Sequence, residues 1–221
     1  MADPKCLAII KLCAVRVTPL NTDGTPNDAG DYYVTDKTVS LGFTPELSTG
    51  TDREIRNGCD CIIAASKAQD ILKRFTFTLD RGNLEPALEA MLLSQEAILD
   101  PEDSDNVIGV NFSGDLGNCD QGAVALEGWA SAEDLDHPDP DYPWLHFRWP
   151  WTQWQIGPGT LSADYFQPQM TGFNRGNPVF GDPYSDLPAS GTGVITNDFF
   201  GYWLQAEDPP TAVCGTQTLI A

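Results

Sequence analysis

The sequence predicts a mainly β protein: an antiparallel β-sandwich or β-barrel with one flanking α-helix. Many short runs alternate apolar and polar residues with the period of two that a half-buried strand requires. Turn residues separate these runs, and one segment carries a helical apolar stripe. With 221 residues, the chain fits one large all-β unit. We expect residues 1–221 to form a single domain, with long loops at about 19–31, 94–106, 131–143 and 175–197.

The first strands are predicted from alternation. Residues 9–18 end in an alternating run, and the next dozen residues are mostly turn-forming types that have no place in a core. Residues 32–35 and 38–44 alternate apolar and small polar side chains, which indicates one or two further strands. We expect Pro45 and the polar cluster at residues 48–51 to end them.

A hairpin and a regular strand follow. Asn57 and Gly58 lie between two extended runs, residues 52–56 and 59–64, and both residue types tolerate the positive φ of a type I′ turn. Residues 73–80 then alternate with period two. This pattern puts Phe75, Phe77 and Leu79 on a core face and Arg74, Thr76 and Thr78 outside.

Residues 84–93 are the segment with a helical pattern. Asn83 is the predicted cap, and Pro86 falls in the first turn, where a missing N–H leaves no hydrogen bond unmade. The expected apolar stripe consists of Leu84, Leu88, Met91 and Leu92.

The second half of the chain is predicted to return to strands. The expected strands are residues 107–112, 123–130, 144–154, about 159–174 and 198–205. Residues 144–154 contain four tryptophans. In an extended chain, Trp144, His146 and Arg148 face one way, and Leu145, Phe147, Trp149 and Trp151 face the other.

The charge balance limits the classes of partner. The chain has 32 acidic and 12 basic residues, so its formal net charge is −20. Affinity for nucleic acid comes from clustered Lys and Arg, so this chain is not expected to wrap around DNA or RNA. The apolar run at residues 6–15 is flanked by Asp3 and interrupted by Lys11, unlike a signal peptide. Because no run reaches the 18 or so apolar residues of a membrane span, we expect synthesis in a cytosol and no membrane insertion.

The residues that usually carry catalysis are scarce. There are two histidines: we expect His137 to be exposed in a loop and His146 to be packed. The acidic run at residues 134–141 is interpreted as a solvated loop rather than a calcium site. The six cysteines are sparse and lack zinc-site spacing, so most are expected to be buried and reduced. The sequence predicts no enzyme, no cofactor and no metal.

Three stretches carry a resemblance to a known family. They are residues 33–67, with paired strands and a long connection; residues 74–80, which run into the helix at 84–93; and the late strand at 144–154, followed by the turn at 170–178. Their order resembles the tail-tube proteins of long-tailed, siphovirus-like bacteriophages, in particular the actinobacterial-phage type. In that family a sandwich-like barrel carries one helix, six copies form a ring, and stacked rings form the tube through which DNA leaves the head.

The resemblance implies a structural virion protein of the phage tail, made in the host bacterial cytoplasm. Its implied partners are further copies of itself, other tail proteins such as the tape measure and the tail terminator, and double-stranded DNA that passes without specific binding. The assembly interface is then expected to include Tyr32, Tyr33, Phe43, Glu54, Arg56, Trp149 and Trp151.

Three alternatives remain open at this point. One is an enzyme, for example a glycoside hydrolase, because Asp and Glu are too numerous for a catalytic pair to be singled out or excluded. Another virion subunit, such as a head-decoration protein or a tail terminator, can share the sandwich fold. A carbohydrate-binding or adhesion module could use Trp144, Trp149, Trp151 or Trp154 as a stacking platform, although a packed core or a subunit interface uses such residues more often.

Overall fold

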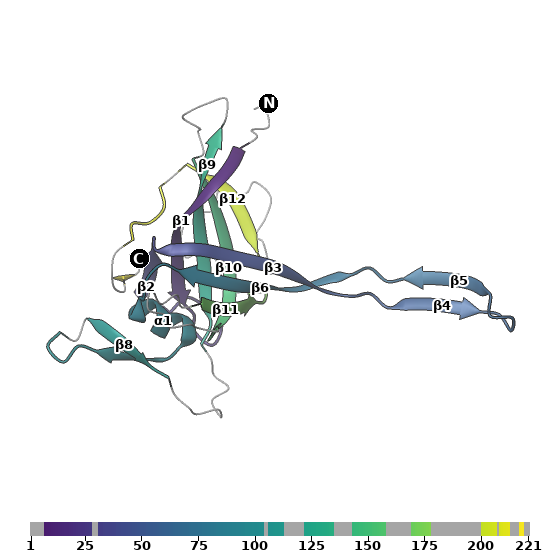
Figure 1. The fold of residues 1–221 in the computed structure, drawn as a ribbon, viewed down its shortest axis with the longest axis horizontal. Coiled ribbons are helices and arrows are strands. Elements are labelled where there is room, and N and C mark those ends of the chain that lie inside the picture. Colours follow the sequence, from purple (N-terminus) through teal and green to yellow (C-terminus); the bar gives the residue numbers. More distant parts are fainter. Residues whose placement is uncertain are drawn as a thin grey trace, which may run out of the picture.

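The computed structural model describes residues 7–27, 31–103, 106–112, 122–134, 143–157, 169–177, 200–206, 208–212 and 217–218. Over these residues the chain is mainly β with a single helix, and every paired strand is antiparallel, so the predicted fold class is confirmed (Figure 1). The elements are β1 (Leu7–Pro19), β2 (Asp31–Thr35), β3 (Thr38–Ser48), β4 (Asp52–Arg56), β5 (Ile62–Lys67), β6 (Ile71–Arg81), α1 (Pro86–Leu93), β7 (Glu96–Leu99), β8 (Val107–Asn111), β9 (Val124–Asp134), β10 (Trp144–Ile156), β11 (Gln169–Asn174), β12 (Gly201–Gln205) and β13 (Gln217–Thr218).

Nine strands form one sheet, in the order β13-β2-β1-β9-β10-β11-β6-β3, with β12 beside the first half of β10. The sheet curves so that its two halves face each other. A Cβ atom at Gly128 in β9 would lie 3.4 Å from Leu12 of β1 and 3.8 Å from Leu41 of β3. Strands that are far apart in the sheet order therefore meet across the interior.

The core fills this curve. Its buried members come from both halves of the sheet and from α1, and include Val15, Val17, Phe77, Leu79, Leu88, Leu92, Leu126, Trp149, Trp154 and Met170. The period-two prediction for β6 is confirmed, because Phe75, Phe77 and Leu79 are buried while Thr76 and Thr78 are exposed. Burying side chains of this size stabilises the fold by roughly 1.5–3 kcal/mol each.

Helix α1 lies against one end of the curved sheet (Figure 1). It begins at Pro86, so the predictions that Asn83 caps it and that Leu84 belongs to its stripe are wrong. Leu84 is exposed. Glu85 is the residue before the helix, and its carboxylate turns away from the helix to accept hydrogen bonds from Thr35 Oγ1 (2.8 Å) and Tyr33 Oη (3.3 Å).

Three predicted boundaries need correction. Strand β3 continues past Pro45 to Ser48, because it lies at the edge of the sheet, where a residue without an N–H is tolerated. The predicted loop at residues 94–106 contains β7, which pairs with β8. The predicted loop at residues 131–143 starts inside β9, which extends to Asp134 in register with β1.

Several predictions fall outside the described residues. They include the acidic run after Asp134 with His137, the first part of the strand at 159–174, Pro178 at the end of the turn at 170–178, most of the loop at 175–197, and Cys6, Cys119 and Cys214. Among the residues that are described, no helix combines the length and apolar character needed to span a membrane.

Candidate functional site

The most prominent surface feature is a long hairpin, residues 47–72, here called the arm. It continues the pair formed by β3 and β6 and ends in the pair formed by β4 and β5, well away from the sheet (Figure 1). Every residue of the arm is exposed except Gly50, which is half-buried. Six large apolar side chains are 42–68% exposed on it: Leu47, Ile55, Ile62, Ile63, Ile71 and Leu72.

The two strands of the arm approach each other closely at its base, at Gly50. Gly50 N donates a hydrogen bond to Asp70 Oδ1 (2.8 Å), and Ala68 N donates to Thr51 O (3.1 Å). A Cβ atom at Gly50 would lie 1.9 Å from Ala68 O, a contact that no side chain could make. Gly50 therefore permits the close backbone approach that joins the two paired segments.

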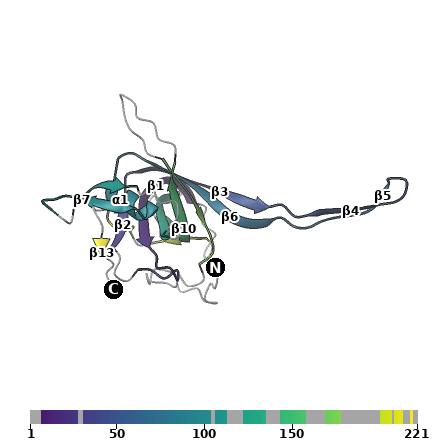
Figure 2. The same ribbon diagram turned by 90° about the horizontal axis from the view of Figure 1, so that it is seen from below.

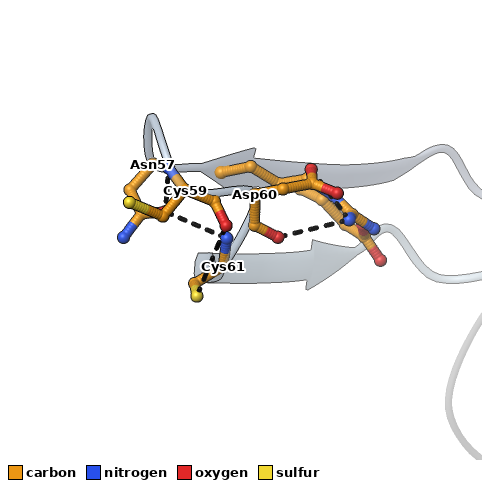
Figure 3. A network of polar contacts seen from close by, with 6 residues as sticks. Asn57, Cys59, Asp60 and Cys61 are labelled. Atoms are coloured by element: carbon orange, nitrogen blue, oxygen red, sulfur yellow. Dashed lines mark hydrogen bonds and ion pairs between the residues drawn. The ribbon is translucent and has the colours of Figure 1, made fainter.

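The tip of the arm is a three-residue loop, residues 58–60, rather than the predicted type I′ turn, and Figure 3 shows its polar contacts. Asp60 N donates to Asn57 O and Asn57 N donates to Cys61 O, both at 2.9 Å. The residue with a positive φ is Asp60, at 63°, and not Asn57 or Gly58. Asn57 Oδ1 accepts hydrogen bonds from the backbone N–H groups of Cys59 (3.0 Å) and Cys61 (2.9 Å). This side-chain contact favours the longer loop.

The two faces of β4 and β5 differ in chemistry. Arg53 pairs with Ser66, and Ile55 with Ala64, so these four residues share one face. On the other face Asp52 lies opposite Lys67, and Arg56 forms an ion pair with Glu54 at 3.0 Å. One face is thus apolar with a single cation, while the other is charged and internally balanced.

The charge of the arm and its base also differs from that of the rest of the chain. Residues 46–74 hold five basic and five acidic residues and are neutral overall, whereas the whole chain carries −20. Three of the other cations, Arg16, Arg81 and Arg148, are buried. Outside residues 46–74, the described part of the chain has three cations that are not buried: Lys11, Lys37 and Arg175. Most of the accessible positive charge in the described part of the chain is therefore on the arm and its base.

The structure separates the residues predicted to form the assembly interface. Glu54 and Arg56 are exposed on the arm, and Phe43 is 42% exposed above an aromatic cluster with Phe75, Phe147, Trp149 and Phe200. Tyr32 is half-buried, whereas Tyr33, Trp149 and Trp151 are buried inside the subunit.

The faces predicted for the side chains of β10 are confirmed as far as Trp149 and are wrong after it. The register with β9 shifts between Trp149 and Thr152, which reverses the alternation. As a result Trp154 joins the core. Trp151 instead contacts Phe173, and the Arg175 guanidinium lies 3.8 Å from the centroid of its ring.

His146 and three of the four tryptophans considered as a carbohydrate platform are packed, whereas Trp144 is half-buried. His146 is 2% exposed and stacks on Trp129, with ring centroids 4.2 Å apart. Trp149, Trp151 and Trp154 are each at most 6% exposed, so their faces are not available as a carbohydrate platform. Among the described residues, no cluster of three or more His, Cys, Asp or Glu side chains is arranged to hold a metal ion.

Sequence reasoning identified the hairpin at residues 52–64 but missed its projection from the body. It also missed the exposed apolar hairpin formed by β7 and β8, which a period-two count over residues 96–99 and 107–111 could have indicated. No model of a known protein family matches the chain, and a search of curated proteins gives no match.

Proposed function

We propose that this protein is a non-enzymatic structural subunit of a phage tail tube, which assembles as stacked hexameric rings around a channel for DNA ejection. The observation that carries this proposal is the arm. It exposes six large apolar side chains on two strands that no other described element covers. An isolated two-stranded hairpin is marginally stable in water at best, so the arm is expected to bind a partner.

The charge distribution supports another copy of the chain as that partner. Two bodies of net charge −20 repel each other. The neutral arm reduces this repulsion where it touches a neighbour, and its accessible cations can pair with acidic groups there. The acidic remainder can then line a channel and repel the phosphates of passing DNA, so that the genome does not adhere.

The burial of the tryptophans argues against the adhesion module. A sugar-binding platform needs an exposed aromatic face, and three of the four tryptophans of β10 are buried. The aromatic residues therefore support a rigid core from which the arm projects, which suits an assembly subunit.

Shortening the arm tests the proposal. In the test variant, residues 48–71 are replaced by Asn-Gly. The described core contains no residue of this segment, so the variant is expected to unfold at a urea concentration close to that of the wild type. Sedimentation velocity should show large assemblies for the wild type and monomers for the variant.

A variant that assembles as the wild type does would contradict the proposal, because the arm would then not be an assembly element. Rings that never stack would instead favour a tail terminator or a decoration protein.

A further inference from the structure

A second exposed hairpin lies on the side of the body opposite the arm. It consists of β7 and β8 and packs beside α1 (Figure 1 and Figure 2). Ala97 and Val110 pair across it and are half-buried, so their face is the one directed towards the body. The opposite, outer face carries Glu96 and Ile98, paired with Asn111 and Gly109.

The outer face has an apolar centre with an acidic neighbour. Ile98 is 46% exposed and lies across Gly109, where an added Cβ atom would be 3.4 Å from Ile98 Cδ1. Glu96 Oε2 accepts a hydrogen bond from Asn111 Nδ2 (3.3 Å), which holds the carboxylate at the surface beside Ile98. Three further large apolar side chains are exposed on this hairpin or directly after it: Leu99, Ile108 and Phe112.

The hairpin itself is acidic. The sequence contains no Lys or Arg between Arg81 and Arg148, and the turn of the hairpin contributes Asp100, Glu102 and Asp103. The hairpin is therefore negatively charged, whereas the apolar face of the arm carries the positive charge of Arg53. Arg53 is exposed and has no ion-pair partner among the described residues.

We propose that the outer face of β7 and β8 is the receptor for the apolar face of the arm from a second copy of the chain. Ile55 would pack on Ile98, and Arg53 would pair with Glu96. Arg53 lies two residues before Ile55 on β4, and Glu96 lies two residues before Ile98 on β7. The spacing between charge and isoleucine is therefore the same on both surfaces, one two-residue repeat of a strand. The inference rests on the proposed assembly through the arm and adds the surface that the arm contacts.

The alternative pairings of these surfaces are less favourable. Two β7–β8 hairpins placed together would bring their carboxylates together, and two arms would bring the Arg53 side chains together. Because the two surfaces lie on opposite sides of one body (Figure 1), pairing arm to hairpin gives a head-to-tail contact that repeats from copy to copy.

Charge exchange across the contact tests this assignment. Arg53→Glu and Glu96→Arg are each expected to raise the protein concentration needed for half-maximal assembly by at least about tenfold, because each places like charges in contact. The double variant Arg53→Glu/Glu96→Arg restores the pair in reversed order, so its assembly should return to within about threefold of the wild type. Light scattering measured at increasing protein concentration gives the concentration for half-maximal assembly, and urea unfolding shows whether each variant is folded.

Two matched controls separate this contact from a general charge effect. Lys11→Glu, exposed on β1 and outside the arm, changes the net charge as Arg53→Glu does, and Glu133→Arg, exposed at the far end of β9, changes it as Glu96→Arg does. Both should assemble as the wild type does.

Single variants that behave as their controls do, or a double variant no better than the worse single variant, would overturn the receptor assignment. If shortening the arm still abolished assembly, the proposed function would stand without it. A wild-type chain that does not assemble at all would overturn both.

Discussion

Arg16 Nε lies 2.7 Å from Glu127 Oε2, and the two residues are direct partners in the register of β1 and β9. Both side chains are buried. His146 Nε2 lies 3.2 Å from the second carboxylate oxygen, and the Arg16 guanidinium lies 5.2 Å from the ring of Trp129. These contacts connect three neighbouring strands on the face that also carries Ala14 and Trp129, behind the main core.

This pair is expected to make stability depend on pH. Burial raises the pKa of Glu127, but the Arg16 charge and the contact with His146 lower it more, to about 2. Because the folded-state pKa is below the ordinary value, the ionised carboxylate stabilises the fold fully above about pH 5, and this contribution is lost as the pH falls towards 2. Glu127→Gln should lower the free energy of unfolding at pH 7 by about 3–5 kcal/mol, since it removes the carboxylate charge that faces the buried Arg16 guanidinium.

Urea unfolding from pH 7 to pH 3 measures both effects. The wild type should lose stability over this range more steeply than Glu127→Gln. The exposed Glu54→Gln serves as the matched control and should change stability by less than about 1 kcal/mol. Equal pH dependence in the wild type and Glu127→Gln would show that Glu127 does not stabilise the fold through its charge.

Core and arm residues should respond differently to truncation. Trp149 is buried against Phe77 and Phe200, at centroid distances of 5.2 Å each, so Trp149→Ala should cost about 3–5 kcal/mol of monomer stability. Ile55→Ala, on the exposed arm, should change monomer stability by less than about 0.5 kcal/mol while weakening assembly. A large loss of monomer stability from Ile55→Ala would mean that the arm packs on its own body.

Features of the fold that depend on neighbouring residues in the sequence are predicted correctly, whereas features that depend on distant strands are not. The alternation of Phe75, Phe77 and Leu79 is a local pattern, and the structure confirms it. The reversal at Trp151 comes from a register shift against β9, which no pattern within residues 144–154 records. The residue before the helix is Glu85, whose carboxylate accepts a hydrogen bond from Thr35, fifty positions away in the sequence. Because no local pattern records this partner, the sequence places the helix start too early and wrongly predicts Asn83 as the cap.

The candidate site was predicted only in part. The hairpin at residues 52–64 follows from its turn residues, but apolar residues such as Ile55 and Ile63 give the same signal in an exposed arm as in a buried strand. Tyr33 and Trp149 are predicted at the interface, but large aromatic residues are common both at interfaces and in cores, and the sequence does not distinguish the two. Their burial depends on the curvature of the whole sheet.

Salt should strengthen assembly. The subunits repel each other through their net charge of −20, and the screening length falls from about 30 Å at 0.01 M salt to about 10 Å at 0.1 M. Light scattering should therefore detect assembly at lower protein concentration as salt rises over this range. The isolated subunit should show no measurable affinity for double-stranded DNA at physiological salt. Tight, salt-sensitive DNA binding would contradict the proposed role.

The thiols at the tip of the arm can report on docking. Cys59 and Cys61 are exposed, whereas Cys13 in β1 is half-buried and serves as an internal reference. Alkylation followed by peptide mass spectrometry should show that both tip cysteines react more slowly in assemblies than in the dilute monomer, with Cys13 unchanged. Equal rates in the two states would place the tip outside every subunit contact.

Electron microscopy of the purified protein is the strongest single test of assembly into tubes. At high protein concentration and moderate salt, we expect hexameric rings and hollow tubes built from stacked rings, and neither should form once residues 48–71 are replaced by Asn-Gly. A protein that stays monomeric under these conditions, without rings or tubes, would rule out the proposed tail-tube role.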